Sequence, residues 1–163
     1  MTNQVEYHIQ KATTEHFEQI VSLWVKLMNI HKDFDKDFFA NTDSSIEQYR
    51  WALNWSLDNS EEEIFIAVLK NKIIGFVTCS CSDGGLANYN QETYCTIGDI
   101  MIESEYQKLG IGQLLLKEVK KWAKSKASNN IILNVFSKNT SALHFFKSQG
   151  FNDNFHNLIL KIE

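Results

Sequence analysis

The sequence predicts an α/β fold in which one domain contains a mixed, mostly antiparallel central sheet of about seven strands flanked by about four helices. Short runs rich in β-branched and aromatic residues alternate with longer segments whose apolar residues recur at helical spacing. The 163 residues include no proline, and no linker, low-complexity tract or internal repeat divides them. We therefore expect a single domain over residues 1–163 with the element order β-α-α-β-β-β-α-β-α-β-β.

The first half of the chain is expected to form a strand, two helices and a hairpin. Residues 5–11 have a strand-like composition, and the apolar residues that follow have the spacing of an amphipathic helix that begins near Thr14. Ser44 and Glu47 have the spacing of a capping box, which predicts that a second helix begins there. The first hairpin strand, its turn, the second strand and the next loop are expected at residues 64–69, 70–72, 73–81 and 82–91.

The second half is expected to begin with a long strand, at residues 93–102, that leads into a glycine-containing segment. Gly150 is the expected C-cap of the last helix, because glycine adopts the left-handed conformation that ends many helices. After the long strand we expect a helix, a strand, a helix and two closing strands, at residues 110–126, 130–135, 140–148, 151–155 and 158–162.

The composition is typical of a soluble protein and indicates neither a membrane nor a metal partner. Apolar residues make up 44% and charged residues 22%, the first residues do not resemble a signal peptide, and no apolar run is long enough to span a membrane. Cys79, Cys81 and Cys95 lack the spacing of a zinc knuckle. We expect them to be buried free thiols of a cytoplasmic protein.

The formal net charge of −4 is distributed unevenly along the chain. From Tyr106 onward there are nine lysines and three acidic residues, whereas acidic residues predominate before it. The basic part begins where a polyanionic cofactor would lie, and the acidic part would attract a cationic second substrate. Solvated charged faces are the alternative interpretation. The net negative charge argues against nucleic acid as a partner.

The segment Gln107-Lys108-Leu109-Gly110-Ile111-Gly112 lies between the long strand and the helix that follows it. Glycines let a backbone pass close to a ligand, and a helix N-terminus presents unpaired N–H groups and a positive dipole end. Such a unit is suited to a pyrophosphate, with an ordinary tight turn as the alternative. Leu115 stands where a dinucleotide-binding fingerprint needs its third glycine, and the Gly-Lys-Ser/Thr of a P-loop is missing.

Two motifs together resemble those of the GCN5-related N-acetyltransferases (GNAT). The segment from Tyr106 to Gly112 is similar to the family's Arg/Gln-x-x-Gly-x-Gly/Ala loop for acetyl-CoA, and Asn139-Thr140-Ser141-Ala142 with Gly150-Phe151 is similar to a second family segment. The expected element order also resembles that of the family. The resemblance covers nearly the whole chain. It implies a GNAT-like enzyme that transfers acetyl from acetyl-CoA to a primary amine of a small molecule or peptide, by direct attack.

The resemblance also implies roles for individual residues around acetyl-CoA. Ile100 and Ile102 would offer main-chain groups to the pantetheine arm, and a backbone N–H near Met101 would polarise the thioester carbonyl. Asn139 would hydrogen-bond the cofactor, although asparagine is also a common helix N-cap. The pyrophosphate would be held by the main chain of the loop residues Gln107, Lys108, Leu109, Gly110, Ile111, Gly112 and Gln113.

Phe146 stands at the cofactor-binding position where many family members have a tyrosine that protonates the departing thiolate. Phenylalanine has no proton to donate, which leaves a rival interpretation open: a non-catalytic domain that binds or senses acyl-CoA. A thiol has a pKa of about 8.5, so the thiolate can leave without full protonation. We therefore expect an enzyme.

Asp99 is the expected base or amine-orienting group. It lies in the long strand that leads to the loop and faces opposite to Ile100 and Ile102. A carboxylate at a strand edge that meets solvent is the alternative interpretation. Glu103 and Glu105 flank the loop and are weaker candidates.

Three further features concern the acceptor and the assembly. The acidic segment 31–37 would attract a cationic amine or form a solvated loop, and it lacks the glycine and glutamate of a calcium-binding loop. Trp51 and Trp55 are expected in the core. The apolar run 158–162 would complete the sheet or pair with another subunit, and we prefer a homodimer.

Overall fold

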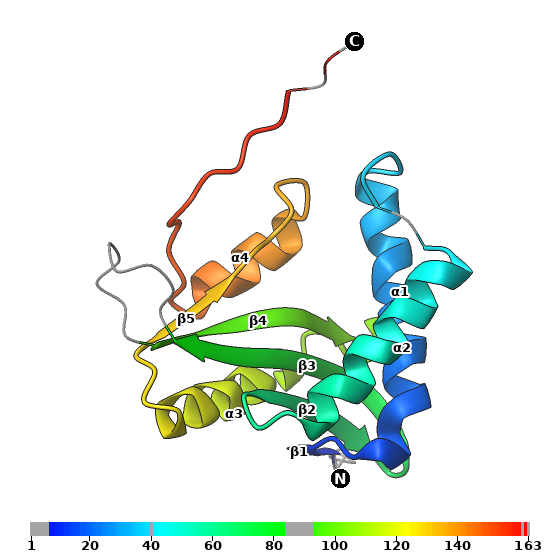
Figure 1. Ribbon diagram of the computed structural model, residues 1–163, viewed down its shortest axis with the longest axis vertical. Coiled ribbons are helices and arrows are strands. Elements are labelled where there is room, and N and C mark those ends of the chain that lie inside the picture. The colour runs from blue at the N-terminus through cyan, green and yellow to red at the C-terminus, as the bar shows by residue number, and fades with distance from the viewer. Residues whose placement is uncertain (1–6, 40, 84–92, 161, 163) are drawn as a thin grey trace, which may run out of the picture.

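The computed structural model describes residues 7–39, 41–83, 93–160 and 162. It shows an α/β fold whose elements follow the expected order as far as the last helix (Figure 1). The strands are β1 (Tyr7–Lys11), β2 (Glu62–Leu69), β3 (Lys72–Asp83), β4 (Thr93–Ile102) and β5 (Asn130–Leu133). The helices are α1 (Phe17–Phe34), α2 (Asp43–Asp58), α3 (Ile111–Ser125) and α4 (Thr140–Ser148), with 3-10 turns at Thr14–His16 and Ser104–Tyr106.

The sheet has the strand order β1-β2-β3-β4-β5, and all neighbours are antiparallel except the parallel pair β4 and β5. The prediction of a mixed, mostly antiparallel sheet is confirmed, but the prediction of seven strands is wrong. Neither closing strand, at 151–155 or 158–162, forms among the described residues, and residues 152–160 are all exposed. A strand needs a partner edge, and this segment meets none within the described chain (Figure 1).

Helices cover both faces of the sheet, and each face has its own hydrophobic core. On one face α1 and α2 pack on the sheet, where Ile20 lies among Ile66 and Phe76. On the other face α3 and α4 contribute Leu115 and Phe146 to the second core. This layering follows from the apolar stripes of amphipathic helices, each of which must be buried against the sheet.

An irregularity in the pairing of β3 and β4 decides which face of the sheet Asp99 meets. The register shifts between Val77 and Cys79, so Gly98 and Asp99 both lie opposite Thr78. The extra residue changes the alternation of side chains: before it odd-numbered residues of β4 pack toward α3, and after it even-numbered ones do. Asp99 consequently faces the layer of α1 and α2, opposite to its isoleucine neighbours, as predicted.

Two expectations for α2 were wrong. Its N-cap is Thr42 and not Ser44: the Ser45 N–H donates to Thr42 Oγ1, and the Thr42 N–H donates to Ser45 Oγ. Thr42 and Ser44 are both residue types that cap helices, and both lie just before the first apolar residue of the helix, so composition alone did not separate them. Trp51 and Trp55 are 73% and 53% exposed, because the opposite side of α2 packs toward the sheet.

The expectation of free thiols was wrong for Cys81 and Cys95, which are joined by a disulfide. They are direct partners in the register of β3 and β4, which their separation of 14 residues in the sequence does not reveal. Cys79 is a free thiol and is buried as expected, and burial raises its pKa to about 12.

Candidate active site

The glycine loop, residues 107–112, has an unusual backbone immediately before α3. Lys108 and Gly110 are both left-handed, with φ of 62° and 83°, and Gly110 is the N-cap of α3. Left-handed residues in a turn gather successive N–H groups around an anion, and the helix N-terminus adds its positive dipole end. Within the described residues, the nearest atom to a Cβ built at Gly110 would be Gln113 Oε1, at 3.9 Å. The loop therefore combines an anion-binding backbone with open space in front of it.

Two side-chain hydrogen bonds hold this loop in place. The Tyr7 hydroxyl on β1 donates to the Leu109 carbonyl at 2.7 Å, and Gln107 Nε2 donates to the Ile102 carbonyl at 3.0 Å. Tyr7 was not identified from the sequence, because no local signal connects it with a loop 102 residues away. Its position next to the loop follows only from the pairing of β1 with the rest of the sheet.

β4 has an open edge that leads to the glycine loop. β5 pairs with β4 only from Tyr94 to Ile97, and the last pair joins Ile97 to Leu133. Beyond this pair, the main chain of residues 98–102 has no strand partner on the β5 side among the residues that the structure describes. A ligand with amide groups can therefore hydrogen-bond along this edge as an additional strand would.

The alternation of main-chain groups determines which residues of β4 serve the open edge. The N–H groups of Asp99 and Glu103 donate to acceptors in β3, at 2.8 and 2.9 Å. Because the direction alternates from residue to residue, the N–H of Met101 also points toward β3, whereas the groups of Ile100 and Ile102 point to the open edge. The Met101 side chain is buried under α1. The main-chain groups available at the open edge are therefore those of Ile100 and Ile102 and not those of Met101.

Asp99 lies beside a buried tyrosine hydroxyl on the α1–α2 face of the sheet. Burial raises the pKa of Asp99 to about 6, and the nearby Tyr49 hydroxyl opposes part of that shift. The Tyr49 ring stacks on Trp24 of α1, with centroids 4.2 Å apart. Its hydroxyl is buried and makes no hydrogen bond of normal distance and angle to the described residues, although it lies close enough to Asp99 for each group to affect the pKa of the other. Burial also raises the pKa of Tyr49, so the hydroxyl remains a donor next to Asp99.

Glu103 and Glu105, the weaker candidates for the base, form ion pairs. Lys26 Nζ lies 2.6 Å from Glu103 Oε1, and Lys72 Nζ lies 3.3 Å from Glu105 Oε1. The hydrogen bond from Lys26 lowers the pKa of Glu103. Asp99 is therefore a better candidate for the base than Glu103, because the pKa of Asp99 is raised and that of Glu103 is lowered.

Asn139 caps α4: its Oδ1 accepts a hydrogen bond from the Ala142 N–H at 3.1 Å. The role of Asn139 as a helix N-cap, which its residue type also suggested, is thus confirmed. Capping uses only the oxygen of the carboxamide, so the Nδ2 group can still donate to a ligand. The two roles proposed for Asn139 are compatible.

Phe146 is only 6% exposed and belongs to the core between α3 and the sheet. Its ring contacts Phe145 and Phe151 edge-on, with centroids 5.2 and 5.5 Å apart. Phe145 lies closer to the glycine loop, because a Cβ atom on Gly112 would stand 2.8 Å from its Cζ. Gly112 therefore allows close packing of α3 on α4, and the sequence did not single out Phe145 for this role.

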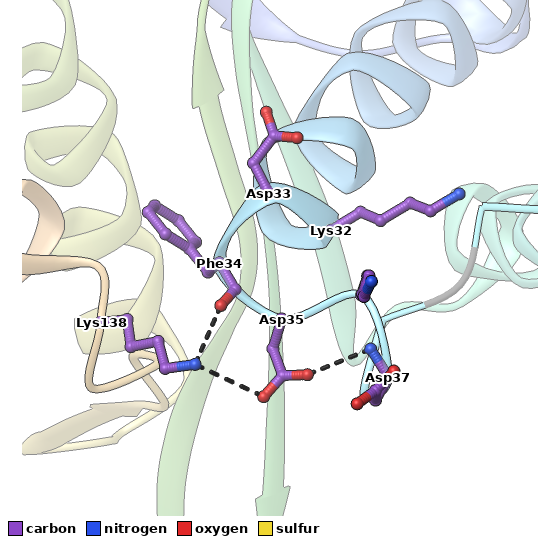
Figure 2. A pocket seen from close by; sticks show the side chains of 7 residues that line it. Lys32, Asp33, Phe34, Asp35, Asp37 and Lys138 are labelled. Atoms are coloured by element: carbon purple, nitrogen blue, oxygen red, sulfur yellow. Dashed lines mark hydrogen bonds and ion pairs between the residues drawn. The ribbon is translucent and has the colours of Figure 1, made fainter.

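A groove of about 810 Å³ lies where the end of α1 meets the connection between β5 and α4 (Figure 2). Lys138 joins the two segments, because its Nζ donates to the Phe34 carbonyl at 3.0 Å and lies 3.6 Å from Asp35 Oδ2. The Asp37 N–H donates to Asp35 Oδ1 at 3.1 Å. The acidic segment is thus a structured turn. Its polar lining also includes Lys32, Asp33 and Lys36.

Aromatic rings form the apolar side of the same junction. Phe136, which follows β5, contacts Phe34, Phe38 and Phe39, with ring centroids 5.1 to 6.4 Å apart. His31 packs on Phe39 at 5.0 Å, and burial lowers the pKa of His31. The connection between α1 and α2 is therefore held against the segment that diverges from the open edge of β4.

The described residues contain neither a cluster of metal ligands nor a membrane-spanning helix. No group of three or more histidine, cysteine, aspartate or glutamate side chains within the described ranges could hold a metal ion. None of the helices in this part of the chain is long and apolar enough to cross a membrane.

The sequence profile of the acetyltransferase (GNAT) family matches residues 24–151. Because this match covers most of the chain, the protein belongs to the GNAT family, and the resemblance inferred from its two motifs is confirmed. The α/β fold with its mixed five-stranded sheet and four helices agrees with this membership.

Sequence relatives and solved structures support the same assignment. An uncharacterised N-acetyltransferase of Methanocaldococcus jannaschii is 24% identical over 147 residues, or 90% of this chain. Streptothricin acetyltransferase A of Bacillus subtilis is 31% identical over 87 residues, or 53% of this chain. The chain spans only 61% and 46% of the lengths of these two relatives.

Among solved structures, a mutant of a Bacillus halodurans protein superposes with a TM-score of 0.85 at 18% identity, covering 96% of this chain and 99% of its own. The aminoglycoside N-acetyltransferase AAC(6')-Iy, in complex with a bisubstrate analogue, superposes with a TM-score of 0.76 at 15% identity, covering 97% and 99% of the two chains. At these identities the likeness concerns the fold.

Proposed function

We propose that this chain is a single-domain, acetyl-CoA-dependent N-acetyltransferase that acetylates a primary amine by direct attack. The observation that carries this proposal is the open edge of β4, which runs from Asp99 to the left-handed glycine loop. The loop suits a pyrophosphate, the edge suits the amides of a pantetheine arm, and Asp99 suits an amine. The proposed sites for the pyrophosphate, the pantetheine arm and the amine thus lie along β4 and the glycine loop that follows it, which is the arrangement that a ternary complex needs.

The cofactor-binding residues follow from the loop and the strand edge. Main-chain N–H groups from Lys108 to Gln113 would bind the pyrophosphate in the open space before Gly110. Ile100 and Ile102 would hydrogen-bond the pantetheine arm, and Asn139 would donate from Nδ2. Gln107 would act indirectly, because its side chain supports the loop by bonding to Ile102. Phe146 would support the site indirectly, because its ring packs in the core beneath α3.

Asp99 would take the proton that an ammonium acceptor must lose before it can attack. With a pKa of about 6, Asp99 is mostly ionised at neutral pH and can accept a proton. The neutral nitrogen then bonds to the thioester carbon and becomes positively charged, loses its second proton to solvent, and the carbon–sulfur bond breaks, so that an amide and a CoA thiolate result. A main-chain N–H on the open edge, from Ile100 or Ile102, would stabilise the oxyanion beside the position first expected, Met101.

The departing thiolate requires no acid at Phe146. A thiol with a pKa of about 8.5 is a good leaving group as the anion and can take its proton from solvent. Direct proton transfer from this position is therefore not part of the proposed mechanism.

The acceptor that we propose is a cationic amine, of a small molecule or a peptide. Asp99 is negatively charged at neutral pH, and acidic residues predominate in the part of the chain before Tyr106. Such a surface raises the local concentration of cations. Relatives of this chain are named for acetylation of streptothricin and of aminoglycosides, so both compounds belong in an acceptor screen.

Thiol release from acetyl-CoA tests the proposed function. The screen includes polyamines, amino acids, N-terminal peptides, streptothricin and an aminoglycoside, with CoA binding measured in parallel by calorimetry. We expect release that saturates with both acetyl-CoA and at least one amine. Saturable CoA binding without release for any amine would instead support the rival function, an acyl-CoA-binding or sensing domain.

A further inference from the structure

The irregular pairing of β3 and β4 is a β-bulge with a threonine side chain at its centre. Two residues of β4, Gly98 and Asp99, lie opposite the single residue Thr78 of β3. On its other side Thr78 pairs with Ile64 of β2. Thr78 is therefore held by a paired strand on one side while it faces the extra residue of β4 on the other.

The hydroxyl of Thr78 binds the main chain of the bulge. The Asp99 N–H donates to Thr78 Oγ1 at 2.8 Å. Because threonine is β-branched, few χ1 rotamers are open to it, and the oxygen stays where the strand directs it. Phe76 belongs to the core beneath α1 and α2, so alternation places the Thr78 side chain on that face too. The hydrogen bond therefore fixes Asp99 from the face of the sheet on which its carboxylate lies.

Gly98 provides the space that this contact needs. A Cβ atom at Gly98 would stand 2.8 Å from Thr78 Oγ1, which is closer than Cβ atoms approach other heavy atoms in proteins. The next atoms among the described residues, Thr78 Cβ and the Thr78 carbonyl oxygen, would lie at an ordinary 4.0 Å. Within the described part of the chain, the hydroxyl is thus the obstacle to a larger residue here, and the two residues are complementary.

The bulge determines the direction of Asp99, on which the proposed reaction depends. Without the extra residue Asp99 would face α3, as Ile97 does two residues earlier. A base must lie within hydrogen-bonding reach of the proton that it removes, and a misplacement of about 1 Å can lower the rate about 10²-fold. A contact that holds the bulge therefore also determines where the carboxylate points.

We propose that Thr78 is a positioning residue for the acetyl transfer. Its hydroxyl holds the Asp99 N–H, keeps the bulge in β4 and so directs the carboxylate toward the acceptor amine, while Gly98 leaves room for the contact. Thr78 acts through Asp99 and not on a substrate. The catalytic part of this inference rests on the proposed function, whereas the structural part can be tested without turnover.

Amide hydrogen exchange measured by NMR tests the structural part. Thr78→Val replaces the hydroxyl by a methyl group, and we expect the Asp99 N–H to exchange about tenfold faster, as the loss of one hydrogen bond implies. Thr78→Ser keeps the oxygen and should restore most of the protection. The matched control is Thr96→Val, the same substitution on the same face of β4, which should leave the Asp99 rate unchanged.

Two results of the exchange experiment would overturn the proposal. One is an unchanged Asp99 rate in Thr78→Val. The other is an acceleration that the amides of Ile97 and Met101 share equally, because it would show a general loss of stability and no local contact.

Steady-state kinetics with an amine from the acceptor screen tests the catalytic part. We expect Thr78→Val to lower kcat about 10–10²-fold while the KM for acetyl-CoA changes by less than about threefold. Thr78→Ser should recover most of kcat. Thr78→Val/Asp99→Asn should be no slower than Asp99→Asn, because Thr78 acts through Asp99. An unchanged kcat in Thr78→Val, or a further fall in the double variant, would contradict the positioning role.

Gly98→Ala probes the same contact from the other side. It should accelerate exchange of the Asp99 N–H and lower kcat as Thr78→Val does. Added to Thr78→Ala it should have little further effect, since the obstructing oxygen is gone, and equal losses in both backgrounds would speak against the pairing of these residues. If the wild-type protein releases thiol with no amine, the proposed function is wrong, and the exchange rate of Asp99 still decides whether Thr78 holds it.

Discussion

Replacing Asp99 by asparagine would remove the proposed base and, at the same time, a buried charge that opposes folding. Burial raises the pKa of Asp99 from its ordinary value of 3.8 to about 6. One pKa unit corresponds to about 1.4 kcal/mol, so the ionised carboxylate destabilises the folded state by about 3 kcal/mol. Asparagine has nearly the same shape and carries no charge.

The sign of the pH dependence follows from this shift. Because the folded-state pKa is higher, the folded protein binds the proton more tightly than the unfolded chain between about pH 4 and pH 6. The stability contributed by protonated Asp99 is complete below about pH 4 and is lost as the pH rises through 6. Asp99→Asn should therefore be more stable than wild type above pH 6, by up to about 3 kcal/mol, and equal to it near pH 4.

Denaturant unfolding at several pH values measures the stability difference, and steady-state kinetics measures the activity. We expect kcat/KM of Asp99→Asn to fall by about 10²–10⁴-fold, and the wild-type kcat/KM to decline below about pH 6. Glu103→Gln is the matched control, because this carboxylate is bound to Lys26 and should not set the pH profile. Full activity in Asp99→Asn would refute the assignment of the base, and an unchanged stability difference across the pH range would refute the buried-charge argument.

Four further substitutions test the loop and the position of the missing acid. Gly110→Ala places a Cβ on a left-handed backbone, so it should lower the free energy of unfolding by about 1–2 kcal/mol and raise the KM for acetyl-CoA. Gly112→Ala should lower the stability because its Cβ would clash with Phe145. Tyr7→Phe removes a hydrogen bond to the loop, so it should raise the KM for acetyl-CoA with little change in kcat, and an unchanged KM would contradict this role. Phe146→Tyr buries a hydroxyl among aromatic rings, so it should lower stability by about 1–3 kcal/mol without raising kcat; faster turnover would show that protonation limits the reaction.

Local signals made much of this fold predictable. Helical spacing identified α1 and α3, and alternation identified the β2–β3 hairpin. The C-cap of α4 is Gln149 and not Gly150 as predicted, but Gly150 follows it directly with the positive φ, 92°, that favours glycine at the end of a helix. The glycine loop before α3 was predictable for the same reason, because its backbone conformation depends on a few consecutive residues. The left-handed conformation of Lys108 was not predictable, because lysine has no preference for it.

Features that depend on partners distant in the sequence were not predictable. A strand-like composition at 158–162 does not reveal whether a partner edge lies in the same chain, which is why the closing strands were expected and do not form. Cys81 and Cys95 are opposite each other only because of the strand register. The proximity of Tyr49 to Asp99 was not predictable either, since it requires α2 to pack over the irregular pairing of β3 and β4.

The central claim is that an acetyl group moves from acetyl-CoA to an amine on this protein. Mass spectrometry of acceptor mixtures incubated with isotopically labelled acetyl-CoA tests it most directly. The account predicts an acceptor whose mass increases by one labelled acetyl group, at a rate that depends on enzyme concentration and falls in Asp99→Asn. A protein that binds CoA with the loop geometry seen here, yet leaves every amine unlabelled, would contradict the claim.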